Sequence, residues 1–204
     1  MQSTNEVKIK SNRRTLLVLL LLFVFPAIVS ITMFATGWRP ASTVNHGELI
    51  IPVRPVADRE MQAIDGKPVK MSELHGKWTL VYFDSSSCSE ACISQLHFMR
   101  QIHLSQGKNY DRIQRVFMLS DSTAVAGLKS KLTDYPDMRV LAGDKAIMNG
   151  LYQDFGIDMQ GVEKDRNIFL LDPQGNVMMR YKPGSEPAGM RKDIERLLKY
   201  SSEK

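Results

Sequence analysis

The sequence predicts an α/β fold, a mixed sheet covered by helices, preceded by one transmembrane helix. Two observations predict it. From about residue 60 onward, apolar strand-like segments alternate with segments of helical periodicity. Near the N-terminus, the run Leu16–Ala35 carries no charge for 20 residues, the length that spans a bilayer. The 204 residues therefore divide into a tail and anchor (1–37), a tether (38–59) and one domain (60–204).

The charges that flank the apolar run predict its orientation. Lys8, Lys10, Arg13 and Arg14 precede it, so the N-terminus is expected in the cytoplasm and the domain across the membrane. The alternative is a cleaved signal peptide, but its apolar region usually spans only about 7–15 residues. The length favours an uncleaved single-pass anchor. This pattern fits a bacterial inner (plasma) membrane protein with a periplasmic domain.

Most of the excess positive charge lies in the tail. Residues 1–37 carry four of the 27 Lys and Arg residues but only one of the 22 Asp and Glu residues. The rest of the chain is nearly balanced and contains no basic run with interleaved aromatic residues. The membrane is therefore an expected partner, and nucleic acid is not.

The elements of the chain can be predicted in order. Prolines in the stretch 38–59 indicate an extended tether or an edge strand. The expected strands are 61–64, 69–71, 79–83, 113–119, 138–141, 167–171 and 176–181. The expected helices are 89–103, 124–132, 144–155 and 187–200. Turn residues at 65–68 and 172–175 predict two hairpins.

Cys88 and Cys92 are the only cysteines, and they lie where the strand 79–83 gives way to a helix. A helix N-terminus lowers a thiol pKa, and the thiolate attacks disulfides and binds soft metals. At this spacing the two sulfurs can meet one metal ion, or each other if the turn distorts. The alternative is a pair of buried structural thiols.

The helical pattern distinguishes the two cysteines. Cys92 falls on an apolar stripe with Leu96 and Met99, so it is expected to face the core. Cys88, at the mouth of the helix, is expected to be the more exposed thiol. Because a disulfide across so short a loop gains little stability, chemistry explains the pair better. A dithiol at the first strand-to-helix turn is the thioredoxin arrangement.

The motif around the cysteines resembles the Sco/SenC family of cytochrome oxidase assembly proteins. The resemblance rests on Gly76–Phe83 followed after four residues by Cys-x-x-x-Cys, and on the segments 116–120, 153–156 and 169–176. It implies a thioredoxin-like fold outside the cytoplasm. It also implies copper bound by both cysteines and one distant histidine. Members deliver copper to oxidase subunit II or keep its cysteines reduced.

The sequence departs from that family at the histidine. In the family it lies eight residues before the aspartate of an Asp-Pro turn, which is Asp172 here, and Lys164 occupies that position. A lysine ammonium has no lone pair for a metal. The predicted metal ligands are therefore only Cys88 and Cys92, which would hold Cu(I) between two thiolates. The family prolines after each cysteine are also missing, and Ser89 is expected to cap the new helix instead.

The other candidates for a third ligand are the four histidines and Met159. His97 points away from the cysteine stripe, His103 is too far along the same helix, and His75 lies in a turn. His46, in the tether, could fold back over the site. Met159 offers a soft thioether close to Lys164 in sequence.

Two charged residues could tune the thiols. Asp84, at the end of the strand, is either a proton acceptor for the dithiol or a turn residue. Lys164 either stabilises a thiolate or is an exposed loop lysine. The chain is expected to be a Sco-like thiol–disulfide protein that acts in cytochrome c oxidase biogenesis. Cys88 and Cys92 are the expected catalytic residues, and the expected partner is an oxidase subunit or assembly factor. The alternatives are a Cu(I) metallochaperone and a non-catalytic docking module.

Overall fold

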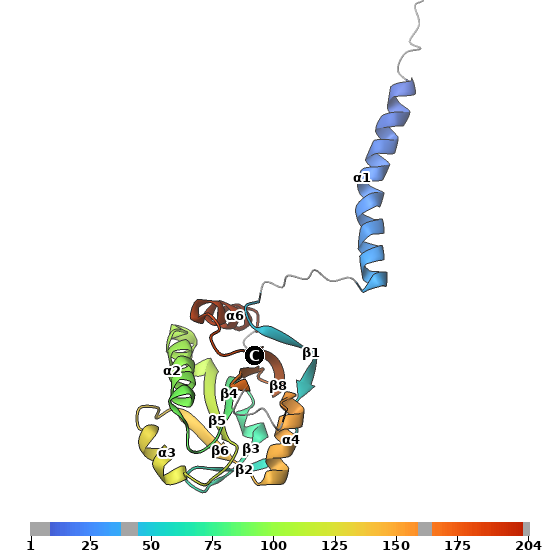
Figure 1. The fold of residues 1–204 in the computed structure, drawn as a ribbon. Helices are drawn as coiled ribbons and strands as arrows, with labels where there is room; N and C mark the ends of the chain where they lie inside the picture. Colours follow the sequence, from blue (N-terminus) through green and yellow to red (C-terminus); the bar gives the residue numbers. More distant parts are fainter. Residues whose placement is uncertain (1–8, 38–44, 159–164, 202–204) are drawn as a thin grey trace, which may run out of the picture. The chain divides into compact units, whose positions relative to one another are not determined.

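The computed structural model describes residues 9–37, 45–158 and 165–201, which belong to two compact units, Met1–Val44 and Asn45–Lys204 (Figure 1). The first unit contains the helix α1 (Ile9–Thr36), with Pro26 inside it. Its segment Arg13–Thr36 is long and apolar enough to cross a membrane. The apolar N-terminal helix predicted from the sequence is therefore confirmed.

The second unit contains the predicted sheet and helices. Its strands are β1 (Glu48–Pro55), β2 (Glu60–Ala63), β3 (Pro68–Lys70), β4 (Trp78–Asp84), β5 (Ile113–Leu119), β6 (Met138–Ala142), β7 (Ile168–Leu171) and β8 (Asn176–Tyr181). Its α-helices are α2 (Glu90–Leu104), α3 (Val125–Lys131), α4 (Lys145–Phe155) and α6 (Pro187–Tyr200), and its 3-10 helices are η1 (Met71–Leu74) and η2 (Gly107–Arg112). Each strand and α-helix predicted between residues 60 and 204 is present, with bounds within one residue of the prediction.

The strands form one mixed sheet in the order β1-β8-β7-β4-β5-β6-β2-β3. The central strands β4, β5 and β6 run parallel, and the outer strands pair antiparallel. Strand β1 lies at one edge against β8, so this part of the 38–59 stretch forms an edge strand. Pro52 and Pro55 are tolerated there because an edge strand leaves some amide positions unpaired.

Both faces of the central strand are buried. Leu80 and Tyr82 pack with residues of α2 and α6, whereas Val81 and Phe83 pack with residues of α4 on the opposite face. Figure 1 shows α2 and α4 on the two sides of the sheet. A strand buried on both faces reads as a continuous apolar run, which is the pattern of β4. The end of β4 therefore lies in the middle of the sheet, beside the parallel end of β5.

Candidate functional site

The cysteine loop connects β4 to α2 at the C-terminal edge of the parallel strands. Ser89 is the N-cap of α2, and its hydroxyl accepts a hydrogen bond from the Cys92 amide at 3.4 Å. The predicted capping role of Ser89 is confirmed. Cys88 has a positive φ of 37°, so the chain turns through a left-handed conformation just before the cap. Cys88 therefore lies outside the helix, whereas Cys92 lies in its first turn.

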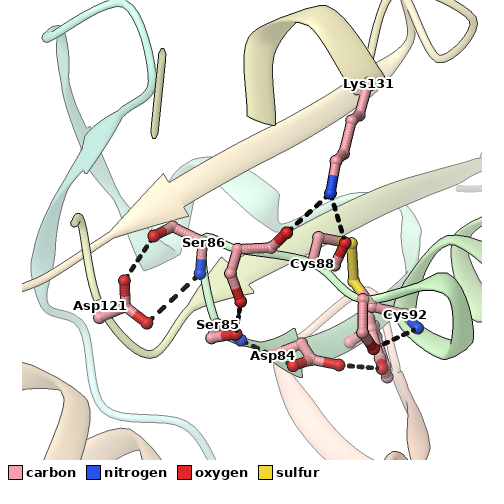
Figure 2. The surroundings of a disulfide bond; sticks show 10 residues. Asp84, Ser85, Ser86, Cys88, Cys92, Asp121 and Lys131 are labelled. Atoms are coloured by element: carbon pink, nitrogen blue, oxygen red, sulfur yellow. Dashed lines mark hydrogen bonds between the residues drawn. A yellow bond between two sulfur atoms is a disulfide. The ribbon is translucent and has the colours of Figure 1, made fainter. Parts of the chain in front are cut away.

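The two cysteines form a disulfide, with their Cα atoms 5.2 Å apart (Figure 2). The sequence left two arrangements open, in which the two sulfurs bind one metal ion or each other. In the structure they bind each other, which the left-handed turn at Cys88 permits. Both cysteines are 0% exposed. The prediction that Cys88 is the more exposed thiol is wrong for this oxidised form. Cys92 faces the core beside Leu96 as predicted, and the bond to it brings Cys88 into the same core cluster.

A buried carboxylate stands at the end of β4. Asp84 is only 3% exposed, and it accepts hydrogen bonds from the Tyr82 hydroxyl at 2.6 Å and the Ser85 amide at 2.8 Å. Burial, together with the hydrogen bond to Asp84, raises the pKa of Tyr82. Tyr82 therefore stays a neutral donor to Asp84 at physiological pH. Asp84 is thus a hydrogen-bonded core group as well as the last residue of the strand.

A second carboxylate anchors the middle of the loop from β5. The hydroxyl of the fully buried Ser86 donates to Asp121 (Figure 2). The same hydroxyl accepts a hydrogen bond from the Ala124 amide at 2.8 Å. Burial opposes the ionised form of Asp121, but hydrogen bonds from Ser86 and Thr123 outweigh it and hold the pKa of Asp121 below its usual range. Asp121 is therefore an ionised anchor for the loop.

A lysine holds the outer side of the loop. The Lys131 ammonium donates to the carbonyl oxygens of Ser87 and Cys88, each at 2.8 Å (Figure 2). Neither Lys131 nor Asp121 was predicted from the sequence. The available signal was topological: Asp121 follows a strand parallel to β4, and the carboxyl ends of parallel strands meet at one sheet edge, where ligands and functional groups gather.

The histidines lie away from the disulfide or have other partners. His97 is exposed on α2, and the buried His103 accepts from Arg115 at its Nδ1 at 3.1 Å. The His46 side chain lies against Gly189 of α6, and the His75 side chain lies against Gly175. Within residues 9–37, 45–158 and 165–201, no group of three or more His, Cys, Asp or Glu residues could hold a metal. Met159 and Lys164, by contrast, lie outside the described residues.

The donor set determines what the site can do with copper. In the disulfide, Cys88 and Cys92 carry no thiolate, so they must be reduced before they can bind a metal. After reduction, two thiolates suit Cu(I), a soft ion. A Cys-Cys-His site is not formed by the described residues. The described residues fit two-thiolate coordination and do not fit the three-ligand site that the family resemblance implies.

The fold and the dithiol loop define a class, that of thioredoxin-fold proteins with a cysteine pair at the first strand-to-helix turn of the parallel strands. The chain belongs to the family described as transmembrane-like, thioredoxin-like, C-terminal domain, whose model matches residues 78–201. The match starts at β4 and ends just after α6, so it includes both cysteines. Among curated proteins, no match is found.

Several solved Sco structures are similar to this chain. ScoI of Bradyrhizobium japonicum with copper bound is 22% identical, with a TM-score of 0.56 over 70% of this chain and 98% of that one. Yeast Sco1 with copper bound is 19% identical, with a TM-score of 0.61 over 73% and 95% of the two chains. BsSco, a Sco-family cytochrome c oxidase assembly protein with a disulfide switch, is 18% identical, with a TM-score of 0.58 over 74% and 96%. At these identities the likeness confirms the thioredoxin-like fold and a structural resemblance to Sco proteins.

Proposed function

We propose that this protein is a membrane-anchored thiol–disulfide protein that acts in cytochrome c oxidase biogenesis through Cys88 and Cys92. One observation carries the proposal. The only two cysteines of the chain are bonded to each other at the edge of the sheet where functional groups gather, and the first of them lies four residues after the buried carboxylate Asp84. The structural likeness to Sco proteins, one of them with a disulfide switch, supports it.

The exchange proceeds in two balanced steps. The Cys88 thiolate attacks one sulfur of a partner disulfide, forms a mixed disulfide and releases the first partner thiolate. The Cys92 thiolate then attacks the Cys88 sulfur, closes the Cys88–Cys92 disulfide and releases the second partner thiolate. Two electrons pass to the partner. The same steps in reverse reduce this protein and oxidise a partner dithiol. Asp84 accepts the proton of Cys92 before the second step.

Burial of the sulfurs controls access to them. Because both cysteines are 0% exposed in the oxidised form, a partner thiolate reaches a sulfur only after the loop 85–89 moves. The loop is held by hydrogen bonds from side chains on neighbouring elements, which a docking partner can replace with its own. We therefore expect small thiols to reduce this disulfide slowly and the partner, an oxidase subunit or assembly factor, to reduce it quickly.

Holding Cu(I) between Cys88 and Cys92 is the second candidate function, favoured by the pair of sulfurs and by copper-bound Sco relatives. It needs the reduced form and no further ligand. A docking module without chemistry is the third candidate. It predicts that replacing both cysteines leaves oxidase assembly intact, whereas the first two predict that assembly is lost.

The proposed location follows from α1 and its flanking charges. We place the domain on the periplasmic side of a bacterial inner membrane, with the N-terminus in the cytoplasm. Alkaline phosphatase fused after Lys204 should be active, and green fluorescent protein fused there should be dark. The opposite pattern would contradict the periplasmic location. The domain would then lie in the reducing cytoplasm, where partner proteins with disulfides are rare.

Trapping the mixed disulfide tests the exchange reaction itself. Cys92→Ser removes the resolving thiol, so Cys88 should stay bonded to its partner in membranes and migrate as a reducible adduct. Cys88→Ser should trap little. A contrary result would be that neither variant traps an adduct and that both thiols of the reduced wild type are alkylated slowly and equally. The thiols would then not exchange with partners, and Cu(I) binding or docking without chemistry would be the better explanation.

A further inference from the structure

The segment that follows β5 holds the middle of the cysteine loop through Ser86. This serine is 0% exposed, and its hydroxyl donates to Asp121 and accepts from the Ala124 amide at 2.8 Å. The amide of Ser86 also donates to Asp121, at 3.4 Å. Figure 2 shows both bonds between the two residues. Ser86 is therefore bonded to the segment after β5 through its main chain and its side chain.

Asp121 is itself fixed by its own neighbours. Its Oδ1 accepts hydrogen bonds from the Thr123 amide at 3.0 Å and from the Thr123 hydroxyl at 2.9 Å. Just before it, the Ser120 amide donates to the main-chain carbonyl of Asp84 at 2.9 Å. The carboxylate that receives Ser86 is therefore a fixed point, and a movement of the loop has to break its bonds to Ser86.

The bonds to Ser86 also restrain the first cysteine. The Cys88 amide donates to the Ser85 carbonyl at 3.2 Å and closes a turn over residues 85–88. Ser86 lies inside this turn, so an outward movement of Cys88 pulls on Ser86 as well. Because Cys88 and Cys92 are both 0% exposed, an attacking thiolate needs such a movement to reach a sulfur.

We propose that the Ser86–Asp121 pair is a latch that keeps the disulfide closed to thiols, with Asp121 as a positioning residue for disulfide exchange. This inference rests on the proposed exchange function and deepens it, because it names the contact that must open before a partner reaches the sulfurs. A hydrogen bond to a carboxylate is about twice as strong as one between neutral groups. The closed form of the loop is therefore stabilised chiefly at this pair.

Burial explains why this contact matters more than the other side-chain anchor of the loop. Lys131 is exposed, so water can replace its bonds to the carbonyl oxygens of Ser87 and Cys88 at little cost. Ser86, by contrast, is fully buried. Loss of the Asp121 acceptor would leave a buried hydroxyl without its acceptor, which costs more than an exposed bond does.

The test measures how fast dithiothreitol reduces the disulfide of the oxidised full chain in detergent micelles. One dithiothreitol thiolate attacks a protein sulfur, and the second thiol then closes the reagent into a cyclic disulfide. Two electrons and two protons pass to the protein, which becomes a dithiol. Samples are quenched with acid at intervals and freed of reagent. Their thiols are then labelled with a maleimide–polyethylene glycol, which separates oxidised from reduced protein on a gel.

The variants separate the latch from general destabilisation. Ser86→Ala removes the hydroxyl, and Asp121→Asn keeps the shape of the side chain but removes its charge. The matched controls, Ser94→Ala and Asp134→Asn, change exposed residues of the same types. Phe155→Ala weakens the core on the opposite face of the sheet and reports on reduction through global unfolding. Cooperative thermal unfolding of each oxidised protein shows that it is folded.

Reduction of Ser86→Ala and of Asp121→Asn should each be about tenfold faster than that of the wild type, the scale of one hydrogen bond to a charged group. The double variant should be little faster than the faster single variant, because both substitutions break the same contact. The two exposed controls and the folded Phe155→Ala protein should match the wild type.

Two results would overturn the inference. One is that Ser86→Ala and Asp121→Asn are reduced at the wild-type rate. The other is that Phe155→Ala is reduced as fast as they are, since the sulfurs would then be reached through unfolding of the whole domain. Failure of the exchange function is read separately: Cys92→Ser then traps no partner in membranes, whereas reduction by dithiothreitol still reports on the latch.

Discussion

The two faces of the sheet differ in chemistry. The face covered by α4 is packed with aromatic rings: Phe155 meets Phe83 with ring centroids 4.9 Å apart and Phe169 at 5.2 Å, both edge to face. Edge-to-face pairs add stability beyond the area they bury. This face contains none of the predicted site residues. Its side chains pack against Val81 and Phe83 and so stabilise the position of β4.

The face covered by α2 and α6 carries the buried polar chemistry. The disulfide belongs to its core, together with Tyr82, which is bonded to Asp84. Arg115, 2% exposed, points to the same side from β5 and donates to His103. Buried polar groups cost free energy unless they are paired. The face covered by α2 and α6 therefore combines a large apolar core with the disulfide and paired polar groups, whereas the core of the face covered by α4 is built from apolar and aromatic side chains.

The largest effect is expected from breaking the aromatic face. Phe155→Ala should lower the free energy of unfolding by about 3–5 kcal/mol, because it leaves a cavity between Phe83 and Phe169. Guanidinium unfolding of the oxidised full chain in micelles measures this. Leu104→Ala, at a 48% exposed position of α2, is the control and should change little. The reduction potential of the folded Phe155→Ala protein should not change; if it does, the two faces are not separate.

A smaller effect is expected from the polar face, on chemistry rather than folding. Asp84→Asn keeps the shape but removes the proton acceptor, so the rate of disulfide exchange should fall by about 10²-fold, at the low end for general acid–base catalysis. The measurement is the exchange rate as a function of pH. Tyr82→Phe removes a donor to Asp84 but leaves the carboxylate, so it should cost much less. An unchanged pH profile in Asp84→Asn would make Asp84 a structural residue only.

The next prediction restores the copper-binding histidine of the Sco family, to test whether a third copper ligand is missing beside the two cysteines. Lys164→His should raise Cu(II) affinity about tenfold or more, which corresponds to about 1.4 kcal/mol. The wild type should bind Cu(II) weakly, without the strong thiolate charge-transfer band of a Cys-Cys-His site. Absorbance titration of the reduced protein measures both. An intense, stable band in the wild type would mean that another residue supplies the third ligand.

The smallest expected effect is a pH dependence of the polar face. Burial lowers the pKa of His103, and because Arg115 donates to its Nδ1, the ring is neutral with its proton on Nε2, bonded to the Tyr110 carbonyl. The unfolded chain protonates near the ordinary value of about 6.5, so it takes up protons before the folded protein does. Stability should therefore be complete above that pH and fall as the pH drops below it.

The matched variants for this pH effect lie on one helix. Thermal unfolding between neutral and mildly acidic pH should show a weaker pH dependence in His103→Gln than in the wild type. His97→Gln, which replaces an exposed histidine of α2, should keep the wild-type slope. Asp137, 3.9 Å from Arg115, is the acidic group that also faces this cluster. Equal slopes in all three proteins would place the acid sensitivity elsewhere.

Much of the fold could be predicted because its signals are local. The periodicity of 2 in strands and of 3.6 in helices, and the turn residues at 65–68 and 172–175, depend only on neighbouring residues. The exposure of Cys88 could not be predicted in this way. Helical periodicity assigned it to the mouth of α2, but the left-handed turn before Ser89 takes it off the helix and into the core.

The order of elements, the apolar N-terminal helix and the cysteine pair at a strand-to-helix turn could all be predicted from local patterns, since each depends on composition and spacing along the chain. The surroundings of that pair, by contrast, depend on contacts between residues far apart in the chain. Asp121 contacts Ser86 across 35 positions, and Lys131 contacts Cys88 across 43. These contacts exist because β4 and β5 pair in parallel and bring the ends of two distant loops together, and no local pattern encodes which residues then meet.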